Sequence, residues 1–171
     1  EEKLVKFLKR IDQELKIRKE KFAIYNVASL SQYEQKSGEK LPAILTIFDG
    51  FDTIKDTALE EAIESMINRL LREGASLGCY VILTALRSNS LKISMSSNIT
   101  SRLAFYLVDE GASKEIIGRD ALIQQEIFGR AQLKEDIPYA IQVYLPISGE
   151  GDIERLYNLE EEVKLIARSW T

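Results

Sequence analysis

Residues 43–50 read Ala-Ile-Leu-Thr-Ile-Phe-Asp-Gly, an apolar run that ends abruptly at an acid and a glycine. A continuous apolar run, as opposed to an alternating one, is typical of a strand buried on both faces in a parallel sheet. The runs 80–85 and 103–108 have the same character, and the periodicity of residues 57–77 predicts a helix between the first two runs. The order strand, helix, strand predicts an α/β domain with a mainly parallel sheet covered by helices.

The three apolar runs are expected to be neighbouring parallel strands. Because the carboxyl ends of parallel strands meet at one edge, Asp49, Ala85 and Asp109 should lie at the same edge of the sheet. This edge is where ligands bind in open α/β sheets.

The flanking segments predict further helices and an edge strand. An amphipathic helix is predicted over residues 3–21, a short helix over 112–117, and a final helix at the C-terminus. Residues 139–145 alternate in polarity, which favours a half-exposed edge strand and leaves an antiparallel pairing open, and a weaker apolar stretch lies at 131–133. The stripe of the final helix consists of Leu159, Val163, Ile166 and Trp170.

The composition is that of an ordinary globular domain. The 171 residues are 45% hydrophobic and 29% charged with a formal net charge of −4, which argues against disorder and against a basic module that coats nucleic acid. No run approaches the roughly 18 apolar residues of a membrane helix. Cys79 is the single cysteine and there is no histidine, which excludes an internal disulfide and histidine-based triads or zinc sites; Cys79 is interpreted as a core thiol.

The first helix carries many cations on the side opposite its apolar stripe. They form either a solvated face or a surface for a partner or nucleic acid, and the acids interspersed among them weaken the second interpretation. These cations are Lys3, Lys6, Lys9, Arg10, Lys16, Arg18, Lys19 and Lys21.

Asp49 is the first candidate for a residue that takes part in metal or nucleotide binding. A carboxylate at the carboxyl end of a buried strand can hold Mg²⁺ through bound water, beside nucleotide phosphates. The alternative from the residues alone is a strand-terminating turn formed by Asp49 and Gly50.

The wider pattern of residues 41–130 resembles the FtsK/SpoIIIE family of motor ATPases. Each element alone is weak evidence for this resemblance, but the order and spacing of the elements match that family. The leading helix with Tyr25-Asn26 also resembles the segment before the family's Walker B strand. The matching elements are Leu41-Pro42, Ile44 to Asp49, Gly74 to Gly78, Val81 to Arg87, Asn98 to Arg102, Asp109 with Ser113-Lys114, Ile116 to Gly118, and Gly129-Arg130.

The resemblance implies a P-loop NTPase fold of the RecA/FtsK type, with three layers and a mainly parallel sheet. No Gly-x-x-x-x-Gly-Lys-Ser/Thr motif occurs, and the chain starts at Glu1 without a methionine. We therefore expect residues 1–171 to be the C-terminal two-thirds of a single such domain, without its Walker A region. In the intact parent the resemblance implies ATP and Mg²⁺, and neither is expected in this segment.

The resemblance also assigns roles to individual residues. Asp49 would contact Mg²⁺ through water, and Thr84 would contact nucleotide. Arg87 and Arg130 would contact phosphate or an interface, or alternatively be surface cations. Arg102 would be an arginine finger or, alternatively, part of a structural ion pair.

Two departures from the family pattern bear on activity. Gly50 stands where the family has its catalytic glutamate, and Leu86 stands where it has a glutamine that senses the γ-phosphate. The resemblance therefore implies an ATPase fold with weak or no activity.

Degenerate positions of this kind resemble the distal ATPase modules of the EssC/EccC motors of type VII protein secretion. This implies a cytoplasmic domain of a membrane-anchored bacterial protein, with other ATPase modules of the same chain, a hexameric ring and secreted substrate proteins as partners. Nucleic acid is not favoured as a partner. The alternatives are a DNA translocase motor and a non-catalytic interaction module that retains only the fold.

A domain of this type without its first strand and helix would expose part of a sheet face or edge near Asp49. We expect the chain either to pack against another copy or to belong to a longer protein.

Overall fold

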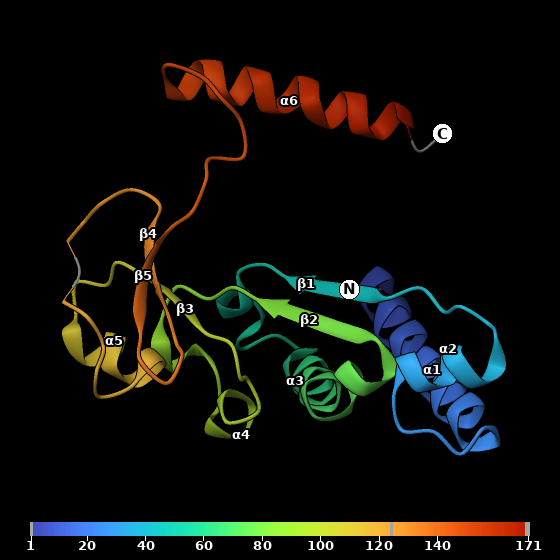
Figure 1. Ribbon diagram of the computed structural model, residues 1–171. Coiled ribbons are helices and arrows are strands. Elements are labelled where there is room, and N and C mark those ends of the chain that lie inside the picture. The colour runs from blue at the N-terminus through green and yellow to red at the C-terminus, as the bar shows by residue number, and fades with distance from the viewer. Residues whose placement is uncertain (1, 124, 170–171) are drawn as a thin grey trace. The chain divides into compact units, whose positions relative to one another are not determined.

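The computed structural model describes residues 2–123 and 125–169 and divides into two compact units, residues 1–100 and residues 101–171 (Figure 1). The helices and strands of the first unit are α1 (Glu2–Ile24), α2 (Leu30–Ser37), β1 (Ile44–Phe48), α3 (Glu60–Arg69), β2 (Cys79–Leu83) and α4 (Ile93–Ser96). The second unit contains β3 (Leu103–Phe105), α5 (Glu110–Ile117), β4 (Arg130–Leu133), β5 (Tyr139–Gln142) and α6 (Asp152–Ser169).

The first two apolar runs form the predicted parallel pair. β1 and β2 run side by side in a two-stranded sheet, with Ile44 opposite Cys79 and Phe48 opposite Leu83. The helix between them is confirmed as α3, which continues as a π-helical turn (Leu70–Gly74) and a 3₁₀ turn (Ala75–Leu77) before β2 begins.

One face of this sheet packs on α1 and α3. Ile44 and Val81 pack against a cluster that includes Leu15 of α1, and Phe48 and Leu83 pack against a cluster that includes Ile63 of α3. Clusters of this kind supply most of the hydrophobic free energy that stabilises a small α/β unit.

The opposite face of the sheet is apolar and exposed, so β1 and β2 are not buried on both faces, contrary to the prediction from their continuous apolar runs. Leu45, Ile47, Tyr80 and Ile82 alternate with the packed residues along the two strands, and their exposed fractions are 56%, 60%, 48% and 47%. Leu45 lies opposite Tyr80 and Ile47 lies opposite Ile82, so the four side chains form one continuous surface, called here the open sheet face.

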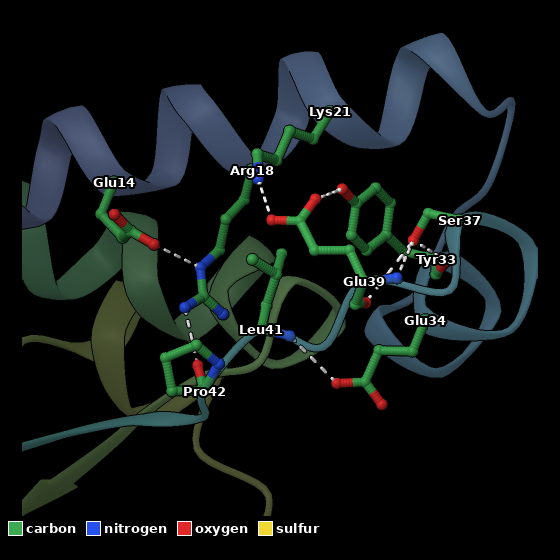
Figure 2. Close-up of polar contacts among 9 residues, drawn as sticks. All are labelled: Glu14, Arg18, Lys21, Tyr33, Glu34, Ser37, Glu39, Leu41 and Pro42. Atoms are coloured by element: carbon green, nitrogen blue, oxygen red, sulfur yellow. Dashed lines mark hydrogen bonds and ion pairs between the residues drawn. The ribbon is translucent and has the colours of Figure 1, made fainter.

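Arg18 joins α1 to the amino ends of both strands. Its side chain is 1% exposed, and it donates to the carbonyl oxygen of Pro42 at 2.7 Å (Figure 2). It also donates to the carbonyl oxygen of Leu77 at 2.8 Å. Its Nε donates to Glu14 at 2.7 Å. Since buried guanidinium groups are stable only when paired and hydrogen-bonded, Arg18 is a structural residue, unlike the solvated cations around it on α1.

Gly78 permits this arrangement. It has a φ of 73°, and a Cβ at this position would lie 2.5 Å from Leu30 Cδ2 and 3.2 Å from the Arg18 guanidinium. Any larger residue would therefore displace both groups.

The third apolar run does not join the parallel sheet, and this part of the prediction was wrong. β3 pairs antiparallel with β4 in a separate three-stranded sheet, with Leu103 opposite Leu133. The strand ends at Phe105, and of its three residues only Ala104 is buried. The apolar run therefore does not reflect burial on both faces, which was the basis for predicting a parallel strand.

The other predicted elements of the second unit are present. The weak stretch at 131–133 forms the central strand β4, and β5 is an antiparallel edge strand, as the alternating pattern indicated. Gln132 is fully buried and links two segments, because its Nε2 donates to Ser113 Oγ at 2.8 Å and its Oε1 accepts from the N–H of Leu122 at 2.9 Å.

The predicted final helix is confirmed as α6, but none of its described residues is buried. Of the predicted stripe, Leu159, Val163 and Ile166 are exposed, and Trp170 lies outside the described residues. No helix in the described part of the chain is long and apolar enough to cross a membrane.

The Arg18→Met variant should lose roughly 2–4 kcal/mol of unfolding free energy, because two buried carbonyl oxygens lose their donors. Urea denaturation of the 171-residue chain, followed by far-ultraviolet circular dichroism, measures this loss. The matched control is Arg10→Met on the exposed side of the same helix, which should change the value by no more than about 0.5 kcal/mol. Equal urea midpoints for the two variants would contradict the structural role of Arg18.

Candidate functional site

The carboxyl ends of β1 and β2 bring Asp49 and Thr84 together. Thr84 Oγ1 donates to Asp49 Oδ1 at 2.6 Å and accepts from the backbone N–H of Gly50 at 2.8 Å. The backbone of Thr84 also bonds to Phe48 O at 3.0 Å and to the N–H of Phe51 at 2.8 Å. The threonine hydroxyl is thus committed to positioning Asp49 and its loop.

Asp49 is exposed, and Thr84 is its one hydrogen-bond partner among residues 2–123 and 125–169. Its second carboxylate oxygen is available to accept a hydrogen bond from a metal-bound water. Within the same described residues there is no group of three or more cysteine, aspartate or glutamate side chains that could hold a metal ion directly. The residues present therefore fit an Mg²⁺ ion that is held through bound water, with nucleotide phosphates supplying its other ligands. They do not fit a metal site in which protein side chains supply all the ligands.

Gly50 has a left-handed backbone conformation, with φ 68° and ψ 56°, and starts a 3₁₀ turn (Phe51–Ile54). Asp49 and Gly50 therefore form a turn, which was the alternative interpretation of this position, and this turn leaves the Asp49 carboxylate exposed. A residue with a Cβ would be strained here by about 1 kcal/mol, so the backbone itself disfavours a catalytic glutamate at this position.

Hydrogen bonds of Asp52 connect the loop after β1 to the loop after β2. Its carboxylate accepts from the N–H of Leu86 at 2.7 Å and from the hydroxyl of Ser90, which is 3% exposed. Burial raises the pKa of the Asp52 carboxyl, but the hydrogen bonds from Ser90 and Leu86 outweigh this effect and hold the pKa below its ordinary value. Asp52 is therefore a structural acid and does not replace the missing glutamate.

Arg87 lines a surface cavity of about 400 Å³ beside these loops, together with Asp52, Lys55 and Leu86. Asp49 and Thr84 do not line this cavity. The side chain of Leu86 is 83% exposed.

The two remaining predicted residues lie in the second unit. Arg102 is half-buried, and its Nη1 donates to the carbonyl oxygen of Ile116 near the C-terminus of α5 at 3.2 Å. Arg130 starts β4, and its Nε donates to Gln142 Oε1 on the neighbouring strand at 3.2 Å. Both contacts are of the kind that holds local structure.

Sequence reasoning named Asp49 and Thr84, which the structure brings together, but gave no role to Asp52 or Ser90. No periodicity marks a loop serine as the partner of an acid 38 residues away.

Over most of its length the chain is similar to part of larger type VII secretion proteins. It is 34% identical over 164 residues to the ESX secretion system protein EccC of Geobacillus thermodenitrificans, a match that covers 96% of this chain and 11% of that protein. It is 31% identical to the type VII secretion system protein EssC of Staphylococcus aureus, which covers 92% of this chain and 10% of that protein. The solved structure of EssC ATPases 2 and 3 from Geobacillus thermodenitrificans matches 99% of this chain with a TM-score of 0.88 and 32% identity.

The chain is homologous to one part of the EssC/EccC secretion ATPases. No protein-family model matches it. The chain spans about a tenth of the length of the curated relatives, with 11% and 10% of the two proteins covered, and 32% of the solved EssC chain.

More distant structures share the fold of the chain. The conjugation coupling protein TcpA, solved with ATPγS, has a TM-score of 0.71 at 20% identity and covers 80% of the chain. The EccC ATPases 2 and 3 of Thermomonospora curvata, solved in complex with a signal sequence peptide, have a TM-score of 0.70 at 19% identity.

The Asp52→Asn variant should be less stable than the wild type at pH 7, by about 1 kcal/mol, because the amide accepts more weakly than the carboxylate. Since the folded pKa of Asp52 lies below its unfolded value of about 3.9, its stabilisation is present above that pH. The stabilisation is lost as the pH falls through the folded pKa. The difference between the two proteins should therefore shrink below about pH 4.

The measurement is urea unfolding of both proteins between pH 3 and pH 7, an interval set by the ordinary aspartate pKa of about 4. The control is Asp56→Asn in the wall of the same cavity, at a left-handed φ of 61° that asparagine tolerates well. A pH-independent difference for Asp52→Asn would contradict the assignment.

Proposed function

We propose that the chain is an ATPase-like module of a type VII secretion motor, and that this module binds ATP with Mg²⁺ but does not hydrolyse it efficiently. The observation that carries the proposal is the pair formed by Asp49 and Thr84 at the carboxyl edge of the parallel strands. Identity of 31–34% to EssC/EccC proteins over more than nine-tenths of the chain supports the secretion context.

Binding is the step that the geometry supports. Asp49 is exposed at the edge where open α/β sheets bind ligands, and Thr84 fixes its orientation. Bound Mg²⁺ would neutralise phosphate charge, and Asp49 would hold a water of its coordination shell. Binding of the nucleotide phosphates also requires a Walker A loop. We propose that another segment of the longer protein supplies this loop.

Turnover is the step that the geometry does not support. Hydrolysis needs a group that orients the attacking water, and the position after Asp49 is occupied by a glycine. Asp52 is bound to Leu86 and Ser90. The exposed apolar side chain of Leu86 cannot form a hydrogen bond with a γ-phosphate.

In the longer protein we place this module on the cytoplasmic side of a membrane, among other ATPase modules of the same chain and within a hexameric ring. Its role there would be regulatory or structural ATP binding combined with recognition of secreted proteins. Arg87, Arg102 and Arg130 are proposed as nucleotide or interface contacts in that assembly. A DNA translocase function is not favoured, since the relatives at 31–34% identity are secretion proteins.

The turnover claim is tested in a protein that joins this chain to a Walker A segment of its EssC/EccC relatives. The wild-type protein should hydrolyse ATP slowly, because losing a positioned catalytic group typically costs about 10²–10⁴-fold in rate. The Gly50→Glu, Leu86→Gln double variant should gain activity, limited by the strain at position 50. The measurement is steady-state phosphate release.

The Asp49→Ala variant is the control for the assigned site. Fast wild-type turnover that this variant abolishes would contradict the proposal, because the site would then be fully catalytic without the glutamate. Slow turnover in both proteins, together with a gain in the double variant, is the expected result.

A further inference from the structure

The turn after β1 contains a sequence that can rearrange covalently without an enzyme. An aspartate followed by a glycine closes to a succinimide ring more readily than other aspartates, because glycine places no side chain beside the attacking backbone nitrogen and allows the backbone to rotate. Asp49-Gly50 is the single Asp-Gly pair in the 171 residues, and no Asn-Gly pair occurs. This turn is therefore the position at which such a rearrangement is chemically easiest.

The rearrangement has two steps and needs only water. The backbone nitrogen of Gly50 attacks Cγ of the protonated Asp49 carboxyl, the N–Cγ bond forms, and the N–H proton leaves with the carboxyl hydroxyl as water. Water then opens the ring at one of its two carbonyl carbons. Opening at Cγ restores aspartate. Opening at the main-chain carbonyl gives isoaspartate, in which the chain runs through the former side chain and the carboxylate is attached to Cα.

One hydroxyl group holds both reacting groups. Thr84 Oγ1 donates to Asp49 Oδ1 at 2.6 Å and accepts from the N–H of Gly50 at 2.8 Å. Ring closure consumes this N–H, so the second hydrogen bond is lost. It also replaces the charged carboxylate by a neutral imide carbonyl, which accepts a hydrogen bond more weakly. Formation of the succinimide therefore works against both hydrogen bonds of the hydroxyl.

The backbone on both sides of the pair is also fixed. The Thr84 N–H donates to Phe48 O at 3.0 Å, and Thr84 O accepts from the N–H of Phe51 at 2.8 Å. Thr53 donates to Gly50 O through its N–H at 2.9 Å and through its hydroxyl at 2.8 Å. Ring closure requires rotation of the peptide group between these anchors. The reaction must therefore wait for a local opening of the turn.

We propose that Asp49-Gly50 is a latent site of isoaspartate formation and that the hydroxyl of Thr84 keeps it in the aspartate form. The hydroxyl that orients the Asp49 carboxylate thus also preserves it. The contacts that carry this inference lie within the two loops at the carboxyl ends of β1 and β2 and involve no nucleotide. The inference is therefore independent of the proposed ATP binding.

The test is the rate at which isoaspartate accumulates at position 49 in the folded 171-residue chain at neutral pH. Incubation in heavy-oxygen water labels each ring opening, and mass spectrometry of the tryptic peptide 41–55 measures the label and the isoaspartate form. Thr84→Val removes the hydroxyl and keeps the side-chain shape. It should accumulate isoaspartate about tenfold faster than the wild type, because both hydrogen bonds to the pair are lost. Thr84→Ser keeps the hydroxyl and should stay close to the wild-type rate.

Two controls separate local protection from a general loss of stability. Arg18→Met destabilises the first unit but keeps the Thr84 hydroxyl, so it should form isoaspartate more slowly than Thr84→Val. The wild-type chain unfolded in urea gives the rate of the unprotected pair and should be the fastest sample. A folded wild type as fast as the unfolded chain would overturn the proposal, whether or not Thr84→Val folds. A rate for folded Thr84→Val no higher than that of the wild type or of Arg18→Met would overturn it as well.

Discussion

The parallel pairing of β1 with β2 is the constraint on which the rest of the first unit depends. Parallel strands cannot be joined by a tight turn, so their register is fixed by the connecting helix and by contacts at the strand ends. Arg18 binds the segments that precede both strands, and Thr84 binds Asp49 where both strands end. The same register therefore places the carboxylate proposed to hold a magnesium-bound water and creates the open sheet face.

The sequence was sufficient for β1, α3 and β2 because each is marked by a long and unambiguous apolar pattern. It failed for β3, since an apolar run of six residues does not reveal its partner strand. Only three residues of that run form a strand, and they pair antiparallel. The structural role of Arg18 could not be predicted from the sequence either. The carbonyl groups that accept its hydrogen bonds lie 24 and 59 positions along the chain, and its neighbours on α1 include similar cations.

For the site, sequence reasoning found the position of the carboxylate but not its environment. An acid after a buried strand is visible in the sequence, and the resemblance to motor ATPases gave it a role. The left-handed conformation of Gly50 and the hydrogen bonds of Asp52 depend on backbone geometry that no residue pattern encodes. These two features support the proposal that this site has no catalytic acid.

The most direct test of the account is the affinity for ATP, with and without Mg²⁺, of the chain joined to a Walker A segment. Binding that depends on Mg²⁺ should weaken about tenfold in Asp49→Asn, equivalent to roughly 1.4 kcal/mol. In the presence of a chelator the two proteins should bind ATP equally. A loss of affinity that is the same with and without Mg²⁺, or no loss at all, would contradict the assignment of Asp49 as the residue that holds the metal-bound water.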